Sequence, residues 1–237
     1  TATMSQVDLG KLETGGLDAA FFIVYTGQSK VSPEGIAKAR ATAETRFAAI
    51  KRMTETYPER IEMAYSAADV RRIHAAGKRV ALIGMENAYP LGMTVDDVPM
   101  WAERGVRYCG ITHMGGNQFG DSSNLKPLWE ERMDVHGGLS NLGRELVTAL
   151  NDYGIMVDVS HAGKATMMQA TAMSRVPVIA SHSGAKAIAD NARNLDDEQL
   201  LAIKANGGVA QMGALGAYVK DLTPEQLAFR DVVRAEM

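Results

Sequence analysis

The chain has 237 residues, of which 46% are hydrophobic and 22% charged, with a formal net charge of −3. This composition is typical of a globular protein with a large core, and its slightly acidic balance gives no reason to expect nucleic acid, which usually needs a basic face. A single cysteine, Cys109, excludes an intrachain disulfide framework, and no apolar run approaches the ~20 residues of a transmembrane helix.

Six apolar runs predict β-strands, and they alternate with helical segments. The predicted strands are residues 17–25, 79–85, 106–112, 155–159, 178–180 and 209–215. The main predicted helices are residues 33–56, 67–76, 94–104, 142–153, 198–205 and 223–237, with one more helix between the fourth and fifth strands and a short one before Gly15. This alternation implies one parallel sheet with helices outside it. Because no linker interrupts the pattern, we expect residues 1–237 to form one domain.

Local signals support the ends of several helices. Ser32-Pro33-Glu34 and Thr223-Pro224-Glu225 each place Pro and Glu at a helix start, and Asp196 or Asp197 is a plausible N-cap. Residues 114–140 form a long loop rich in Gly, Asn, Asp and Ser, and such loops are usually functional or disordered. Three apolar side chains indicate that this loop packs against the domain: Leu128, Trp129 and Leu139.

Residues 154–183 hold two strands that end on the same dipeptide, Ser160-His161 and Ser181-His182. About one helix lies between them, so this is a βαβ unit with parallel strands. Parallel strands bring their carboxyl ends to one edge, where α/β folds place their active sites. His161 and His182 should therefore lie together. The alternative is that each His only caps its strand.

The same rule brings two further side chains to this edge, since Glu86 follows the second strand and His113 the third. One carboxylate with imidazoles suits Zn²⁺ or a related divalent ion, and a carboxylate can bridge two such ions. The alternative for Glu86 is a carboxylate bonded to loop amides. His74 lies inside a predicted helix and His136 in the long loop, so neither is assigned to the site.

Arg193 follows the fifth strand by a short loop on the same edge. Its planar guanidinium suits a substrate carboxylate. An equally good interpretation is a surface arginine paired to Asp190 or Asp196. Cys109 lies within an apolar run and is expected to be a small core residue.

With these residues assembled, the chain resembles the membrane (renal) dipeptidase family of metal-dependent amidohydrolases. The matching segments run in the family's order over residues 80–208: IGMEN, GVRYCGITHMGGNQFGDS, GLSNLGRELV, MVDVSH, PVIASHSGA and ARNLDDEQL. The resemblance implies a (β/α)8 TIM-type barrel with two bridged divalent ions, with Zn²⁺ the expected metal, that hydrolyses dipeptides through a metal-bridging hydroxide. It makes Glu86 the bridging carboxylate, His161 and His182 ligands of the second ion, His113 the contact to the tetrahedral oxygen, and Arg193 the holder of substrate.

The sequence also departs from the family pattern. The family's first strand ends in His-x-Asp, which occurs nowhere in this chain, and the chain stops before the Gly-Ser-Asp-x-Asp-Gly motif of the last strand. The six strands would then be strands two to seven of eight. We therefore expect the strands at residues 17–25 and 209–215 not to pair with each other, because two barrel strands would lie between them.

The function expected from the sequence is that of a zinc-dependent dipeptidase acting on a dipeptide substrate. Another amidohydrolase reaction, such as amide or lactone ring opening, and an inactive relative that binds a partner are the alternatives. The chain does not begin with Met and shows no signal peptide, so it could be a processed form or an excerpt. Oligomeric state, a homo-oligomer included, and compartment, whether cytoplasmic or exported, stay open.

Overall fold

The structure, a computed structural model, describes residues 5–124 and 135–236. Its strands are β1 Ala19–Tyr25, β2 Ile61–Met63, β3 Arg79–Glu86, β4 Val106–Gly110, β5 Met156–Asp158, β6 Ile179–Ser183 and β7 Val209–Met212. All pair in parallel, in the order β1-β3-β4-β5-β6-β7, and β2 also pairs with β3. The predicted six strands are present, but the prediction missed β2. β2 pairs with Arg79–Ala81, at the start of β3, before the residues of β3 that pair with β4. It has only three residues, which are too few to show an alternation of apolar and polar side chains.

The helices follow the predicted alternation. They are α1 Leu9–Thr14, α2 Pro33–Thr56, α3 Ala67–Ala75, α4 Val98–Glu103, α5 Asn141–Asp152, α6 Lys164–Met173, α7 Asp197–Asn206, α8 Gly216–Val219 and α9 Pro224–Glu236, with a 3-10 turn η1 at Tyr89–Leu91. Ser32 caps α2 and Asp196 caps α7, the latter in a capping box with Gln199. The helix predicted over residues 94–104 begins only at Val98, because Pro99 favours the first turn of a helix. No helix in the described part of the chain is both long and apolar enough to cross a membrane.

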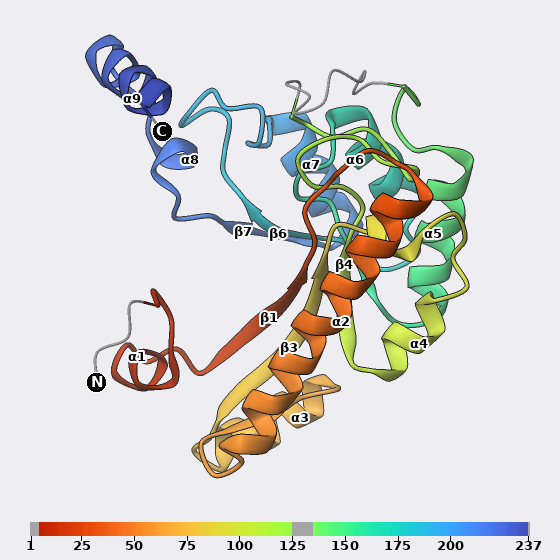
Figure 1. The fold of residues 1–237 in the computed structure, drawn as a ribbon, viewed down its shortest axis with the longest axis vertical. Coiled ribbons are helices and arrows are strands. Elements are labelled where there is room, and N and C mark those ends of the chain that lie inside the picture. The colour runs from red at the N-terminus through yellow and green to blue at the C-terminus, as the bar shows by residue number, and fades with distance from the viewer. Residues whose placement is uncertain (1–4, 125–134, 237) are drawn as a thin grey trace.

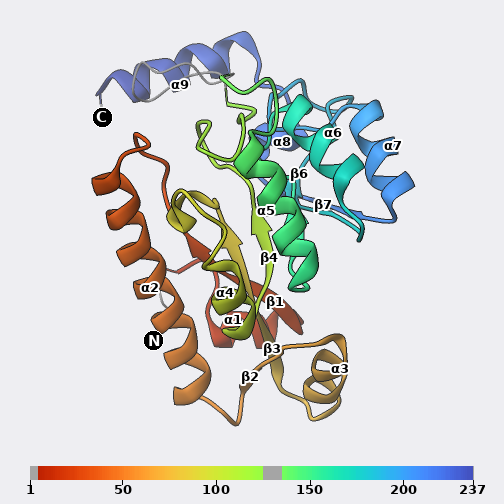
Figure 2. The ribbon, with the colours of Figure 1, turned by 90° about the vertical axis from the view of Figure 1, so that its right-hand side faces the viewer.

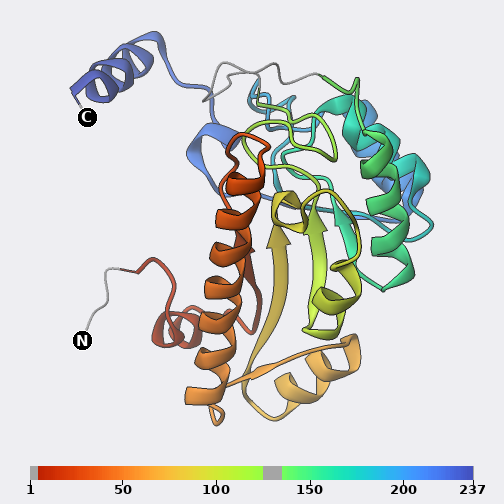
Figure 3. The same ribbon diagram turned by 45° about the vertical axis from the view of Figure 1, so that its right-hand side comes forward.

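The sheet is curled, and helices cover its outer side. Figure 1 shows α2, α4 and α5 on this side of the strands, and Figure 2 shows α5, α6 and α7 standing side by side. In Figure 3, β3 and β4 run in the same direction beside α2. Alternate side chains of the strands point toward these helices and form one apolar core, to which Met85, Cys109 and Val157 belong. Cys109 is 2% exposed, which confirms its predicted place in the core.

The inner side of the sheet is open, as in half of a barrel. A cavity of about 540 Å³ lies there, lined by β1, β3, β4, β6 and β7, with Phe21, Tyr108 and Gln211 among its walls. Among the described residues, β1 pairs only with β3 and β7 only with β6, so the two outer strands do not pair with each other. This confirms the sequence prediction and excludes a closed six-stranded barrel for this part of the chain.

Candidate metal centre

Three predicted ligands meet at the carboxyl edge of the sheet. Glu86 is the last residue of β3, His182 lies in β6, and His161 follows β5 by three residues. Their ligand atoms all lie within 4.8 Å of one another. Glu86 Oε1 is 3.2 Å from Nε2 of each histidine, and the two Nε2 atoms are 2.9 Å apart. This convergence is the one expected from strand-end positions, and binding of a metal by these residues stays a prediction.

His113, three residues beyond β4, lies against the same group. Its Nε2 is 3.6 Å from Glu86 Oε1, and its ring packs 4.2 Å from the His161 ring. The loop that follows holds both histidines, since the Ser122 hydroxyl donates to the His113 carbonyl at 2.5 Å and lies 3.2 Å from the His161 carbonyl. The predicted packing of this loop is thus borne out at Leu139, which is 4% exposed, whereas Leu128 and Trp129 lie outside the described residues.

Two left-handed residues shape the backbone around the site. Asn87 has a φ of 81° and His161 a φ of 68°. Left-handed φ values are uncommon outside glycine, and asparagine is several-fold enriched in them. The Asn87 side chain is fully buried and donates to the Thr26 carbonyl while accepting from the Tyr89 amide. This side chain therefore ties the ends of β1 and β3 together beside Glu86.

The charges of the group suit a cation. Burial lowers the pKa of His161 to about 3 and also lowers the pKa of His113, so both imidazoles are neutral near pH 7. Burial alone would raise the pKa of Glu86, but its interactions with the neighbouring His161 and His182 outweigh it and hold that pKa well below its usual range. One carboxylate and neutral imidazoles are the donor set of a divalent transition ion such as Zn²⁺. The residues present thus fit a metal, and His161, His182 and Glu86 would hold it.

Arg193 lies beside this group, in the loop before α7. Its Nη2 donates to the His182 carbonyl at 3.1 Å, and its guanidinium lies over the Tyr218 ring. Neither Asp190 nor Asp196 is paired with it: Asp196 binds Lys164, and Asp190 lies near Lys186. The buried Nε of Arg193 has no hydrogen-bond partner among the described residues. The binding of a substrate carboxylate by Arg193 stays a prediction.

The two histidines left out of the site lie apart from it. His74 is on α3 with a side chain that is 60% exposed, 3.5 Å from Asp18. His136 lies before α5, where its Nε2 is 3.0 Å from the Asn117 carbonyl oxygen. Neither belongs to the described group of ligand atoms.

The sequence interpretation missed two residues behind the ligands, Asp158 and Ser181. Asp158 Oδ2 accepts a hydrogen bond from the Ser181 hydroxyl at 2.6 Å, and that hydroxyl is 2.7 Å from Nδ1 of His182. The signal that could have revealed them is a lone Asp within the apolar run of residues 155–159. A carboxylate is rarely buried in a strand without a partner.

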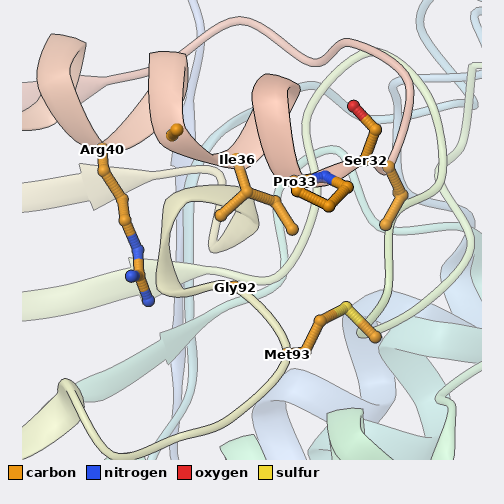
Figure 4. A pocket seen from close by; sticks show the side chains of 8 residues that line it. Ser32, Pro33, Ile36, Arg40, Gly92 and Met93 are labelled. Atoms are coloured by element: carbon orange, nitrogen blue, oxygen red, sulfur yellow. The ribbon is translucent and has the colours of Figure 1, made fainter.

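A second cavity, of about 460 Å³, lies between the first turns of α2 and the segment at Gly92–Met93. Figure 4 shows Pro33, Ile36 and Met93 around it, with Arg40 at one end. Arg40 is already bonded to the Leu91 carbonyl and to Asp97, so it offers this cavity little polar chemistry. The cavity contains none of the predicted site residues.

Comparison with known proteins identifies the family to which this chain belongs. The family model described as membrane dipeptidase (peptidase family M19) matches residues 1–235. The chain belongs to the membrane dipeptidase family.

Similar members of the family come from fungi and bacteria. A dipeptidase of Claviceps purpurea, tcpJ, is 32% identical over 231 residues, which are 96% of this chain and 53% of that protein. The probable dipeptidase PvdM from Pseudomonas aeruginosa is 36% identical in sequence to this chain. Its crystal structure superposes with a TM-score of 0.91, and the match covers 98% of this chain and 59% of PvdM. A metallopeptidase from Rhodobacter sphaeroides shares the fold, with a TM-score of 0.80 at 23% identity over 96% of this chain and 72% of its own. The chain spans about half the length of the curated relatives it matches.

Proposed function

We propose that this membrane dipeptidase family chain takes part in metal-dependent hydrolysis of dipeptides. The observation that carries the proposal is the meeting of one carboxylate oxygen and two imidazole nitrogens within 4.8 Å at the carboxyl edge of a parallel sheet. In α/β barrels this edge is where catalytic residues lie. The names of two relatives agree with dipeptide hydrolysis: tcpJ is named a dipeptidase, and PvdM a probable dipeptidase.

In the proposed reaction the residues have different tasks. Glu86, His161 and His182 would hold a divalent ion, for which we propose Zn²⁺, and we propose a second such ion that would also use Glu86. When bound, such an ion would lower the pKa of a bound water toward neutrality and would polarise the scissile carbonyl. The three described ligands suffice for one ion, so a second ion needs further ligands.

His113 and Arg193 act on the substrate. His113 Nε2 lies 3.6 Å from Glu86 Oε1, and the ring is neutral near pH 7, so with its hydrogen on Nε2 it would stabilise negative charge that develops on the carbonyl oxygen. Arg193 has a buried Nε without a partner among the described residues, and it binds the substrate carboxylate. Burial lowers the pKa of Arg193, but a guanidinium stays charged near neutral pH.

The test is zinc binding by the chain itself, followed by dipeptide hydrolysis. The metal-free chain should bind Zn²⁺ with a 1:1 or 2:1 stoichiometry in calorimetry, and His182→Ala should remove at least one equivalent. His74→Ala, a histidine away from the group, is the matched control and should bind like wild type. Binding that His182→Ala leaves unchanged would contradict the assignment of the ligands. Zinc-dependent release of amino acids from a dipeptide library would then identify the reaction, and opening of a lactone without dipeptide cleavage would favour another amidohydrolase activity.

A further inference from the structure

The His182 ring is held on the side away from the other ligands. Its Nε2 faces Glu86 Oε1 and His161 Nε2, while its Nδ1 is 2.7 Å from Ser181 Oγ. Ser181 Oγ is in turn 2.6 Å from Oδ2 of Asp158, in the neighbouring strand β5. The three groups form a continuous chain from a buried carboxylate to a ligand ring.

The direction of the hydrogen bonds follows from the donors around Asp158. Its Oδ1 accepts from the amides of Ser160 and Ser181, both at 3.0 Å, and its side chain is 1% exposed. Burial raises the pKa of Asp158, whereas these two amides and the Ser181 hydroxyl, three donors that point at one carboxyl group, favour its ionised form, which can only accept. The single hydrogen of the Ser181 hydroxyl then points to Asp158. Ser181 Oγ is therefore an acceptor toward His182, so the imidazole hydrogen lies on Nδ1.

The two ligand histidines differ in what holds their rings. The His161 side chain is 7% exposed and its buried Nδ1 has no hydrogen-bond partner among the described residues, so packing and its left-handed backbone fix this ring. The His182 side chain is 36% exposed and has less packing to hold it. A ring of this kind needs a hydrogen bond to fix its orientation and tautomer.

We propose that Asp158 and Ser181 are positioning residues that fix the ring and the Nδ1–H tautomer of His182, which leaves the Nε2 lone pair free for a divalent cation. The inference rests on the ligand role proposed for His182. The inference adds Asp158 in β5 and Ser181 in β6 to the residues proposed to determine the metal affinity of the chain. Outer partners of ligand histidines typically contribute 10–100-fold in metal affinity.

The first experiment uses the metal-free chain and does not depend on metal binding. Nitrogen-15 NMR of the imidazoles, with the His182 signals assigned by their loss in His182→Gln, should show the hydrogen on Nδ1. In Asp158→Asn the amide oxygen keeps the two backbone donors and its NH₂ group turns to Ser181. The Ser181 hydrogen then points to His182, so the imidazole hydrogen should move to Nε2. An Nε2–H signal in wild type, or no change in Asp158→Asn, would overturn the inference.

The second experiment measures zinc dissociation constants. Ser181→Ala and Asp158→Asn should weaken binding about 10–100-fold, and Ser181→Thr, which keeps the hydroxyl, should restore it to within about threefold of wild type. Ser183→Ala is the matched control, because Ser183 lies two residues along the same strand, is fully buried, and its hydroxyl hydrogen-bonds only with that of Ser160 among the described residues. Urea unfolding of each metal-free variant checks that it is folded.

The outcomes separate the two proposals. If wild type binds no zinc, the proposed metal function fails, while the tautomer result still decides the positioning role. If wild type binds zinc and Ser181→Ala binds it equally well, the positioning role fails and the metal function stands. Equal weakening by Ser183→Ala and Ser181→Ala would also overturn the inference, because a general packing defect of β6 would then explain both.

Discussion

Replacement of Asn87 by alanine should destabilise the fold and loosen the metal centre together. Its amide makes four hydrogen bonds: it donates to the Thr26 carbonyl and to Gln28 Oε1, both at 3.1 Å, and accepts from the Tyr89 amide at 3.2 Å and from Asn117 at 3.0 Å. In Asn87→Ala the buried Thr26 carbonyl and Tyr89 amide lose this partner, at about 1–3 kcal/mol each. The left-handed φ of 81° adds about 1–2 kcal/mol for alanine.

The sum predicts a loss of about 3–8 kcal/mol in the free energy of unfolding, large against the roughly 5–15 kcal/mol of a typical domain. At roughly 3 kcal/mol per M, the urea midpoint of the metal-free chain should fall by about 1–3 M. Asn87→Gly loses the same hydrogen bonds without the backbone strain, so it should be more stable than Asn87→Ala by about 1 kcal/mol. An Asn87→Ala midpoint within about 0.3 M of wild type, or no difference between the two variants, would refute this reasoning.

Three further results are expected. His113→Ala should keep the zinc affinity of the chain and, in a form that hydrolyses dipeptides, should lower kcat roughly 10²–10³-fold. His182→Ala should instead lose zinc. Loss of zinc in His113→Ala would mean that His113 is a metal ligand. Burial lowers the pKa of His161 to about 3, below its unfolded value of about 6.5, so its unfolded form binds more protons between these values. The contribution of the neutral ring to stability is therefore present above about pH 6.5 and is lost as the pH falls toward about 3. The urea midpoint of the metal-free chain should fall over this pH range, and it should fall less steeply in His161→Ala. In Gly84→Ala the new Cβ would lie 2.3 Å from Cζ of Tyr108, so unfolding measurements should show a loss of about 1–3 kcal/mol, and a neutral result would mean that the Tyr108 ring moves freely.

The convergence of Glu86, His161 and His182 could be predicted from the sequence because one topological rule places them. Once residues 79–85 and 155–159 are parallel strands, Glu86 and His161 must lie at the same edge, whatever the details of packing. The start of α4 and the strand β2 could not be predicted as well, because both depend on a few residues whose partners lie elsewhere in the chain.

The residues behind the ligands were hidden for a different reason. The bond from Ser181 to Asp158 joins two strands, and it exists only because Asp158 pairs with Ile179 in this register. Likewise, the role of Asn87 depends on its left-handed backbone, which the sequence Glu-Asn does not reveal. Side chains that act through register or through φ need coordinates before they can be assigned.

The parallel register also decides where this chain can accept a change of length. Tyr25 pairs with Glu86 at the end of β1 and β3, so the register of these two strands, rather than a loop, fixes the position of the Glu86 carboxylate. One residue inserted within Arg79–Glu86 would turn Glu86 from the inner face of the sheet toward the helices, because strand side chains alternate. Zinc binding should vanish in such a variant, whereas two glycines added between Gln28 and Ser29, in the connection before α2, should leave the ligands in place. Homologues that differ in length are thus expected to differ in their connections, while the span from each strand's first residue to its ligand stays constant.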